Sequence, residues 1–125
     1  MRPSTSESFS FRARMRSLYH AMTGILEFLR DEHNARIHVV ATICVGIAAY
    51  VFRVTLMEAA LLSIVIAGVW ITEMLNTCVE RTMDFVHPEE HPRIRFIKDL
   101  AAGAVLVASI AAVVVGLLIF IPKMK

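Results

Sequence analysis

Three long stretches of this chain carry almost no charged residues, and the charged residues gather between them. The stretches cover residues 37–52, 59–79 and 100–121. The last one has no charged residue and is followed by Pro122, just before two lysines. An α-helix rises about 1.5 Å per residue, so about 20 apolar residues cross the roughly 30 Å of hydrocarbon in a bilayer. The pattern therefore predicts three membrane-spanning helices.

The first two stretches depart from a purely apolar pattern. Residues 37–52 are short for a span, but Arg36 and Arg53 flank them, and long basic side chains can reach the membrane surface. The second stretch carries Glu73 and Asn76 in its interior. Because a carboxylate inside the hydrocarbon is costly, we expect Glu73 to have a function.

Residues 11–35 show an amphipathic pattern. Apolar side chains recur at steps of three and four residues, while arginines and other polar side chains occupy the opposite face. Ser8 or Ser10 is a suitable N-cap for this helix. We expect a surface helix in the cytoplasmic headgroup layer, preceded by a flexible segment at residues 1–10. A helix packed on a soluble partner protein is the alternative.

The composition agrees with a membrane protein. Of the 125 residues, 57% are hydrophobic, and the mean hydropathy is +0.63. Soluble domains contain roughly 45–50% apolar residues. A chain of this length forms one domain. Acidic residues interrupt the arginines of the N-terminal segment, which argues against nucleic acid as a partner.

The distribution of lysine and arginine predicts the orientation in the membrane. Basic residues are concentrated before the first span and between the second and third spans. Cytoplasmic segments of membrane proteins are enriched in these residues. We therefore expect a multi-pass protein of the bacterial inner (cytoplasmic) membrane, with the N-terminus and residues 80–99 in the cytoplasm.

One stripe of the second span is acidic. Glu73, Asn76, Glu80 and Asp84 are spaced i, i+3, i+7 and i+11, which places them on one helical face. Hydrogen bonds that only join helices are the simpler explanation. So many anions together suit a divalent cation better, because Mg²⁺ takes one or two carboxylates and completes its shell with water and phosphate. Glu32, just before the first span, can supply a second carboxylate.

The acidic stripe lies in a longer run that resembles a known family. Residues 72–86 read TEMLNTCVERTMDFV and fit the pattern E-x-x-N-T-x-x-E-x-x-x-D, which resembles the prokaryotic diacylglycerol kinase family. The segments RSLYHAMTG, EHNARIH and HPEEHPRIRFIKDLAAGAVL stand in family order, so the resemblance covers nearly the whole chain after Arg12. His91 and Pro92, with KDLAAGAVL, resemble the Gram-positive branch that phosphorylates undecaprenol more than the branch that acts mainly on diacylglycerol.

The resemblance implies a role for each matched residue. Glu73 matches the catalytic base, and Glu32 and Glu80 match the carboxylates that bind Mg²⁺. The lipid acceptor is expected against Glu73 and Ala102. Family members work as homotrimers whose sites form between subunits. The residues expected around ATP are His20, Glu32, Asn76, Glu80, Asp84, Glu89, Glu90, His91, Lys98 and Asp99.

We therefore expect an all-α membrane protein with a single kinase domain over residues 1–125. Besides the surface helix it would contain spans at 37–53, 57–85 and 97–121 and a cytoplasmic loop at 86–96. The expected reaction is phosphorylation of a membrane lipid alcohol by Mg·ATP, with undecaprenol favoured over diacylglycerol. The expected partners are ATP, the lipid alcohol, the bilayer and further copies of this chain. The sequence has no G-x-x-x-x-G-K-[ST] motif, so we do not expect a P-loop.

Two other classes of function remain open at this point. In a small proton-coupled transporter, Glu73 would carry protons within the membrane. A non-enzymatic scaffold is the third reading. The cytoplasmic cluster of Glu80, Asp84, Lys98 and Asp99 argues against a transporter, which does not need it, and a scaffold leaves the acidic stripe unexplained.

Overall fold

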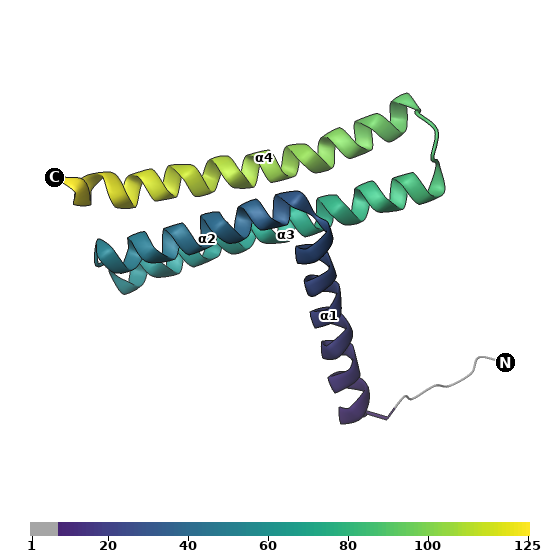
Figure 1. The fold of residues 1–125 in the computed structure, drawn as a ribbon, viewed down its shortest axis with the longest axis horizontal. Coiled ribbons are helices and arrows are strands. Elements are labelled where there is room, and N and C mark those ends of the chain that lie inside the picture. Colours follow the sequence, from purple (N-terminus) through teal and green to yellow (C-terminus); the bar gives the residue numbers. More distant parts are fainter. Residues whose placement is uncertain (1–7) are drawn as a thin grey trace. The chain divides into compact units, whose positions relative to one another are not determined.

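The computed structural model describes residues 8–125, and these are almost entirely helical (Figure 1). Residues 1–7, which hold most of the segment expected to be flexible (1–10), lie outside the described residues. The chain forms two compact units, Met1–His33 and Asn34–Lys125. The helices are α1 (Phe11–Asp31), α2 (His33–Val51), α3 (Leu56–Val86), α4 (Pro92–Phe120) and the short 3₁₀ helix η1 (Ile121–Met124).

Helix α1 begins and ends where local hydrogen bonds cap it. Ser10 is the N-cap, and its side-chain oxygen accepts a hydrogen bond from the Ala13 amide at 3.3 Å. The helix ends at Asp31 because Glu32 has an extended backbone, and the Glu32 amide donates to the carbonyl of Phe28. A single helix over residues 11–35 was expected. The break at Glu32 instead assigns the residues from His33 onward to α2.

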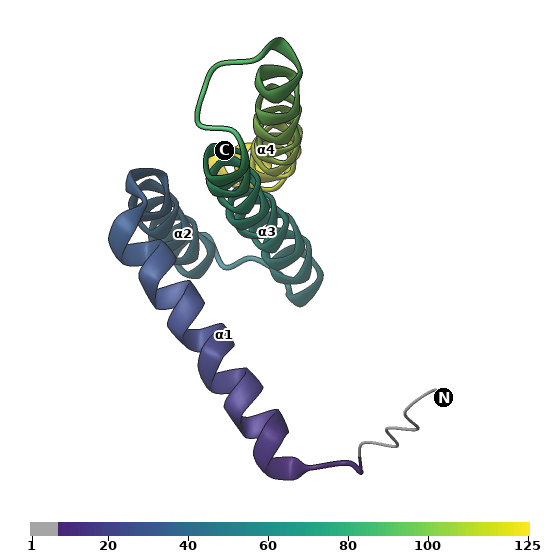
Figure 2. The same cartoon turned by 90° about the vertical axis from the view of Figure 1, so that its right-hand side faces the viewer.

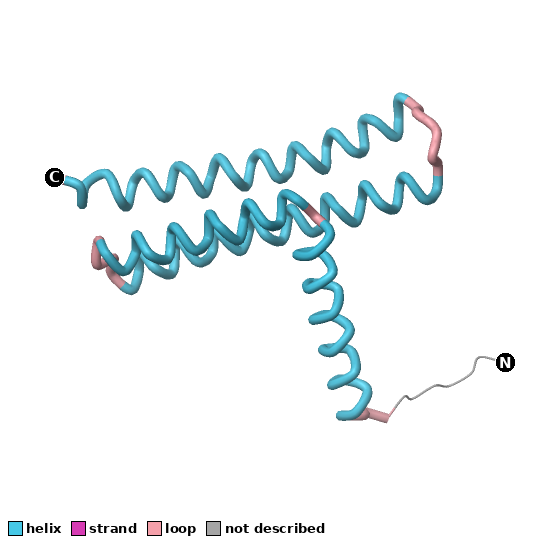
Figure 3. Tube along the Cα trace, viewed as in Figure 1, coloured by secondary structure: helices cyan, strands magenta, loops and turns pink. Residues whose placement is uncertain are grey.

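A tight turn reverses the chain between α2 and α3. Arg53 has a φ of 52°, a left-handed conformation that is uncommon for a residue with a side chain. The side-chain oxygen of Thr55 accepts from the Glu58 amide at 3.2 Å, and the Glu58 carboxylate accepts from the Thr55 amide at 2.8 Å. This reciprocal capping box fixes the start of α3. The turn therefore makes α2 and α3 antiparallel neighbours (Figure 3).

Helices α3 and α4 run side by side, and α2 and α4 flank α3 (Figure 2). His91 caps α4 by accepting from the Arg93 amide at 3.1 Å, and Pro92 occupies the first turn. Helix α4 therefore begins at Pro92, whereas the span was expected to begin at residue 97. The cap at His91 starts the helix among the charged residues that precede the apolar stretch. At the other end, Lys123 and Glu58 form an ion pair at 3.0 Å.

Apolar side chains cover the outside of the second unit. Few residues are buried, among them Leu62, Val69 and Ile119, while large apolar side chains along α2, α3 and α4 are exposed. A protein in water rarely exposes so much apolar surface. Three helices, His33–Val51, Leu56–Val86 and Pro92–Met124, are long and apolar enough to cross a membrane. The prediction of an all-α membrane protein with three spans is confirmed.

Candidate active site

The acidic stripe of α3 contains the buried polar residues of the described part of the chain. Glu73 is 4% exposed, Asn76 8% and Thr77 9%. Glu80, two helical turns from Glu73, is partly exposed. The helical rise separates Glu73 from Glu80 by roughly 10 Å along the axis. Helical periodicity thus produces a face with a buried carboxylate at one depth and a more accessible carboxylate nearer the end of the helix.

Glu73 contacts a histidine of the neighbouring helix. His38 of α2 places its Nε2 atom 3.3 Å from Oε2 of Glu73. An ionised carboxylate only accepts hydrogen bonds, so it pairs with the imidazole tautomer that carries its proton on Nε2. His38 was not among the site residues predicted from the sequence. The available signal was a titratable side chain inside an otherwise apolar span, the same signal that identified Glu73.

Asn76 and Glu80 present oxygen atoms that suit a hard cation. The Asn76 amide nitrogen donates to Glu80 Oε1 at 3.2 Å. Among the described residues, the Asn76 side-chain oxygen is buried and has no hydrogen-bond partner. A buried acceptor of this kind calls for a partner. Amide and carboxylate oxygens are ligands that Mg²⁺ takes, so these residues fit the metal expected from the sequence.

A complete metal cage is not formed by the described residues. Within residues 8–125, no three histidine, cysteine, aspartate or glutamate side chains converge closely enough to hold an ion. Mg²⁺ needs fewer protein ligands, because it commonly uses one or two carboxylates and takes the rest from water and substrate phosphate. The pair formed by Asn76 and Glu80 therefore agrees with a partial site that a nucleotide would complete.

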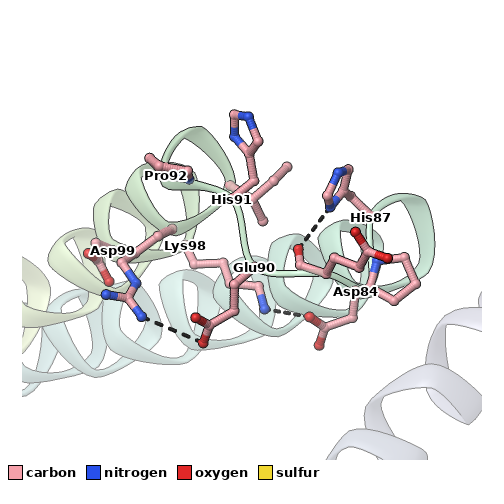
Figure 4. Close-up of a pocket in the computed structure, with 11 residues that line it drawn as sticks. Asp84, His87, Glu90, His91, Pro92, Lys98 and Asp99 are labelled. Carbon is pink, nitrogen blue, oxygen red and sulfur yellow. Dashed lines mark hydrogen bonds and ion pairs between the residues drawn. The ribbon is translucent and has the colours of Figure 1, made fainter.

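An open cavity of about 460 Å³ lies between the end of α3, the connecting loop and the start of α4 (Figure 4). Lys98 of α4 forms an ion pair with Asp84 of α3 across it. Arg95 lies 3.6 Å from the Glu90 carboxylate. The cavity thus combines two cationic and several anionic side chains. Its lining residues are Asp84, His87, Pro88, Glu89, Glu90, His91, Pro92, Ile94, Arg95, Lys98 and Asp99.

The loop beside this cavity is held by its two histidines. His87 donates from Nδ1 to the backbone carbonyl of Glu89 at 2.8 Å, while Nδ1 of His91 accepts from the Arg93 amide. The two rings meet edge to face, with their centroids 5.8 Å apart. These contacts fix the loop between α3 and α4, so the carboxylates of Glu89 and Glu90 are carried on an ordered rim.

The structure brings only part of the predicted nucleotide set to this cavity. Arg95 was not predicted, although its spacing of three and four residues from Lys98 and Asp99 places the three on one helical face. Asn76 and Glu80 lie outside the cavity lining, on the part of α3 between Asp84 and Glu73. His20 and Glu32 belong to the N-terminal unit, and Ala102 is exposed on α4. The predicted residues that line the cavity are Asp84, Glu89, Glu90, His91, Lys98 and Asp99.

A second, largely apolar groove of about 560 Å³ runs between α2, α3 and α4. Its polar lining includes His38, Thr42, Trp70 and Ser109. The Trp70 indole nitrogen donates to the Thr42 hydroxyl at 3.0 Å. The remaining lining is aliphatic or aromatic and extends to Met124. An apolar groove therefore reaches the histidine that contacts Glu73.

Comparison with known proteins identifies similar sequences over most of the chain. The sequence model described as prokaryotic diacylglycerol kinase matches residues 19–120. The undecaprenol kinase of Bacillus subtilis (strain 168) is 37% identical over 109 residues, which cover 87% of this chain and 89% of that protein. A diacylglycerol kinase of a Synechocystis species is 35% identical over 109 residues, covering 86% of this chain and 62% of that protein.

Proposed function

Because this chain belongs to the prokaryotic diacylglycerol kinase family and is therefore a lipid kinase, we propose that it transfers the γ-phosphate of ATP to the hydroxyl of a membrane lipid alcohol. Undecaprenol is the favoured acceptor, since the Bacillus subtilis relative is an undecaprenol kinase and is similar along nearly its whole length. Diacylglycerol is the second candidate. The observation that carries the proposal is the buried carboxylate of Glu73 on α3, the helix whose end lines the charged cavity.

The charged cavity is the proposed nucleotide site. Phosphate oxygens need cationic partners, and Lys98 and Arg95 supply them from one face of α4. In the free protein these cations are paired with Asp84 and Glu90. Binding of ATP would therefore exchange these ion pairs for contacts to the phosphates.

The proposed metal site lies between this cavity and Glu73. Glu80 and the buried side-chain oxygen of Asn76 would hold Mg²⁺, with Glu32 as the further carboxylate. When bound, Mg²⁺ would neutralise the negative charge that the phosphates bring. The assignment of Glu32 rests on the family resemblance, since Glu32 belongs to the other unit of the chain.

Glu73 is the proposed general base. The lipid hydroxyl would give its proton to the Glu73 carboxylate while its oxygen forms a bond to the γ-phosphorus. The bond from that phosphorus to the bridging oxygen of ATP breaks, and ADP leaves. Burial of Glu73 keeps bulk water from competing with the lipid for the phosphoryl group.

The apolar groove is the proposed place for the lipid tail. Its lining residues come from all three spans, and its polar end contains His38, the neighbour of Glu73. A tail in this groove would leave its hydroxyl at the depth of Glu73. Apolar side chains contact many hydrocarbon chains equally well, which agrees with a family that includes kinases of different lipids.

We place the protein in the bacterial inner membrane as a homotrimer, with the N-terminus and the loop between α3 and α4 in the cytoplasm. The orientation follows from the basic residues around that loop. A trimer would let Glu32 and His20 of the N-terminal unit complete a site on a neighbouring copy. The surface helix α1 would lie at the cytoplasmic membrane surface, where its arginines meet anionic lipid.

Transfer of labelled phosphate to lipid tests the proposed function directly. The purified protein would be reconstituted into vesicles with labelled Mg·ATP and either undecaprenol or diacylglycerol. We expect label in the lipid fraction, with undecaprenol as the better acceptor. Proton flux across the vesicles without phosphoryl transfer would instead support a transporter. Transfer to diacylglycerol alone would reject the substrate preference and retain the reaction.

A further inference from the structure

We propose that His38 is a positioning residue for Glu73, and that its imidazole fixes which carboxylate oxygen of Glu73 accepts the proton of the lipid hydroxyl. This inference rests on the proposed function, because it assigns a partner to the proposed base. The His38 Nε2 atom lies 3.3 Å from Glu73 Oε2. That bond occupies Oε2 and leaves Oε1 for the substrate.

The burial of the Glu73 side chain gives this contact its weight. The Glu73 side chain is 6% exposed, and the His38 side chain is 22% exposed. Little water reaches the carboxylate, so a hydrogen-bond donor from the protein takes the place of solvent. A donor on one oxygen restricts the rotation of the carboxylate, which would turn more freely without it. His38 therefore determines the direction from which Glu73 can meet a hydroxyl.

The His38 ring is itself held between α2 and α3. The Trp70 indole packs edge to face against it, with ring centroids 6.0 Å apart. The Trp70 indole nitrogen donates to the Thr42 hydroxyl at 3.0 Å, and that hydroxyl donates to the backbone carbonyl of His38 at 2.7 Å. The hydrogen bond to Thr42 holds Trp70, the ring neighbour of the imidazole, against α2. They join the two helices at the depth where Glu73 is buried.

His38 also connects the proposed base to the proposed lipid site. His38, Thr42 and Trp70 line the apolar groove, whereas the Glu73 carboxylate lies just beyond His38. A lipid hydroxyl at the end of the groove would therefore meet His38 and Glu73 together. This location distinguishes His38 from polar side chains whose role is only to form hydrogen bonds between helices.

Kinetics of two His38 variants test the proposal in the full chain, reconstituted in vesicles. His38→Leu removes the donor, and we expect kcat to fall at least about tenfold because a small misplacement of a reacting group is costly. The KM values for ATP and lipid should stay within about twofold. His38→Gln retains an N–H at a similar reach and should restore kcat to within a few-fold of the wild type. Ser63→Ala is the matched control, since the Ser63 hydroxyl donates to the Ala59 carbonyl within its own helix.

A double variant distinguishes positioning of the base from a structural role. In a Glu73→Gln background the base is absent, so adding His38→Leu should cause little further loss of kcat. An equal loss in both backgrounds, or a Gln variant as impaired as the Leu variant, would overturn the proposal. Near-normal turnover of Glu73→Gln alone would instead reject Glu73 as the base, so the two failures are distinguishable.

Thr42→Val provides a second route if His38→Leu does not yield folded protein. The valine has a similar shape but cannot accept the Trp70 hydrogen bond. We expect kcat to fall about two- to tenfold with unchanged KM, because the imidazole loses part of its support. An unchanged kcat in folded Thr42→Val would contradict the proposal.

Discussion

The side chain of Asn76 is oriented by Glu80, one helical turn away. Its amide nitrogen donates to Glu80 Oε1 at 3.2 Å, and its buried side-chain oxygen has no hydrogen-bond partner in the described chain. The two residues therefore offer oxygens of both amide and carboxylate type on the face of α3 that leads from Glu73 to the charged cavity. A cation held there would lie between the proposed base and the proposed nucleotide site.

The first prediction concerns this metal site. Glu80→Gln and Glu32→Gln should each raise the Mg²⁺ concentration needed for half-maximal activity, by roughly tenfold, because each replaces an anionic ligand with a neutral one of the same shape. Activity titrated against Mg²⁺ at saturating ATP is the measurement. Glu27→Gln on the exposed surface of α1 is the control and should leave the titration unchanged. Unchanged titrations in both site variants would mean that other residues hold the cation.

The second prediction concerns the base. Glu73→Gln should lower kcat by ~10²- to 10⁴-fold, the usual contribution of general-base catalysis, with little change in the KM for ATP. Steady-state kinetics on reconstituted protein provides the measurement. The control is Glu58→Gln on the same helix, which keeps an acceptor for the Thr55 amide, loses the ion pair to Lys123 and should leave kcat intact. Near-normal kcat of a folded Glu73→Gln protein would make Glu73 a structural residue only.

Periodicity along single helices made the acidic face of α3 predictable. The spacing of Glu73, Asn76 and Glu80 depends only on helical geometry, so it could be read from the sequence. The contact between His38 and Glu73 could not, because it depends on how α2 rotates against α3. Nothing in the spacing within either helix specifies that rotation.

Helix ends were harder to predict than spans. Apolar length identifies the segment inside the bilayer, but a helix continues past the membrane when local capping favours it. Pro92 and the His91 cap start α4 among charged residues. At Glu32, an extended backbone separates α1 from α2 without any glycine or proline to indicate a break. Conformation at that position depends on the surroundings of the chain rather than on local propensity.

The third prediction concerns the nucleotide site. Lys98→Gln should raise the KM for ATP by about tenfold or more and leave the KM for lipid within about twofold, because a cation beside the phosphates is lost. Kinetics with each substrate varied in turn provides the measurement. Arg93→Gln, on the same helix but outside the cavity lining, is the control. An equal rise in both KM values would indicate general damage to the fold.

The fourth prediction concerns orientation. A single cysteine at Glu89 should be shielded from an impermeant thiol reagent in intact cells, because the basic residues predict a cytoplasmic location for this loop. Cys44 and Cys78 would first be replaced by alanine. A cysteine at Val54, in the turn between α2 and α3, serves as the positive control and should be labelled from outside. The reverse labelling pattern would place the charged cavity away from cytoplasmic ATP.

The last prediction concerns the apolar groove. Gly116 of α4 lines this groove, and a Cβ atom added there would meet no described atom within 4 Å beyond its chain neighbours and the backbone of its own helix. Gly116→Leu should therefore fold and project its side chain into the groove, raising the KM for a long-chain lipid alcohol severalfold. A short-chain alcohol that does not reach Gly116 should be affected less, and the KM for ATP should not change.

A glycine outside the groove provides the control for this substitution. Gly68 of α3 has equally open space around its added Cβ but is not part of the groove lining. Gly68→Leu introduces the same apolar bulk into a span and should leave the dependence on lipid length unchanged. If Gly116→Leu and Gly68→Leu alter the kinetics alike for long and short lipids, the tail does not occupy the groove. A selective loss for long lipids in Gly116→Leu alone would locate the tail between α2, α3 and α4, with its hydroxyl next to His38 and Glu73.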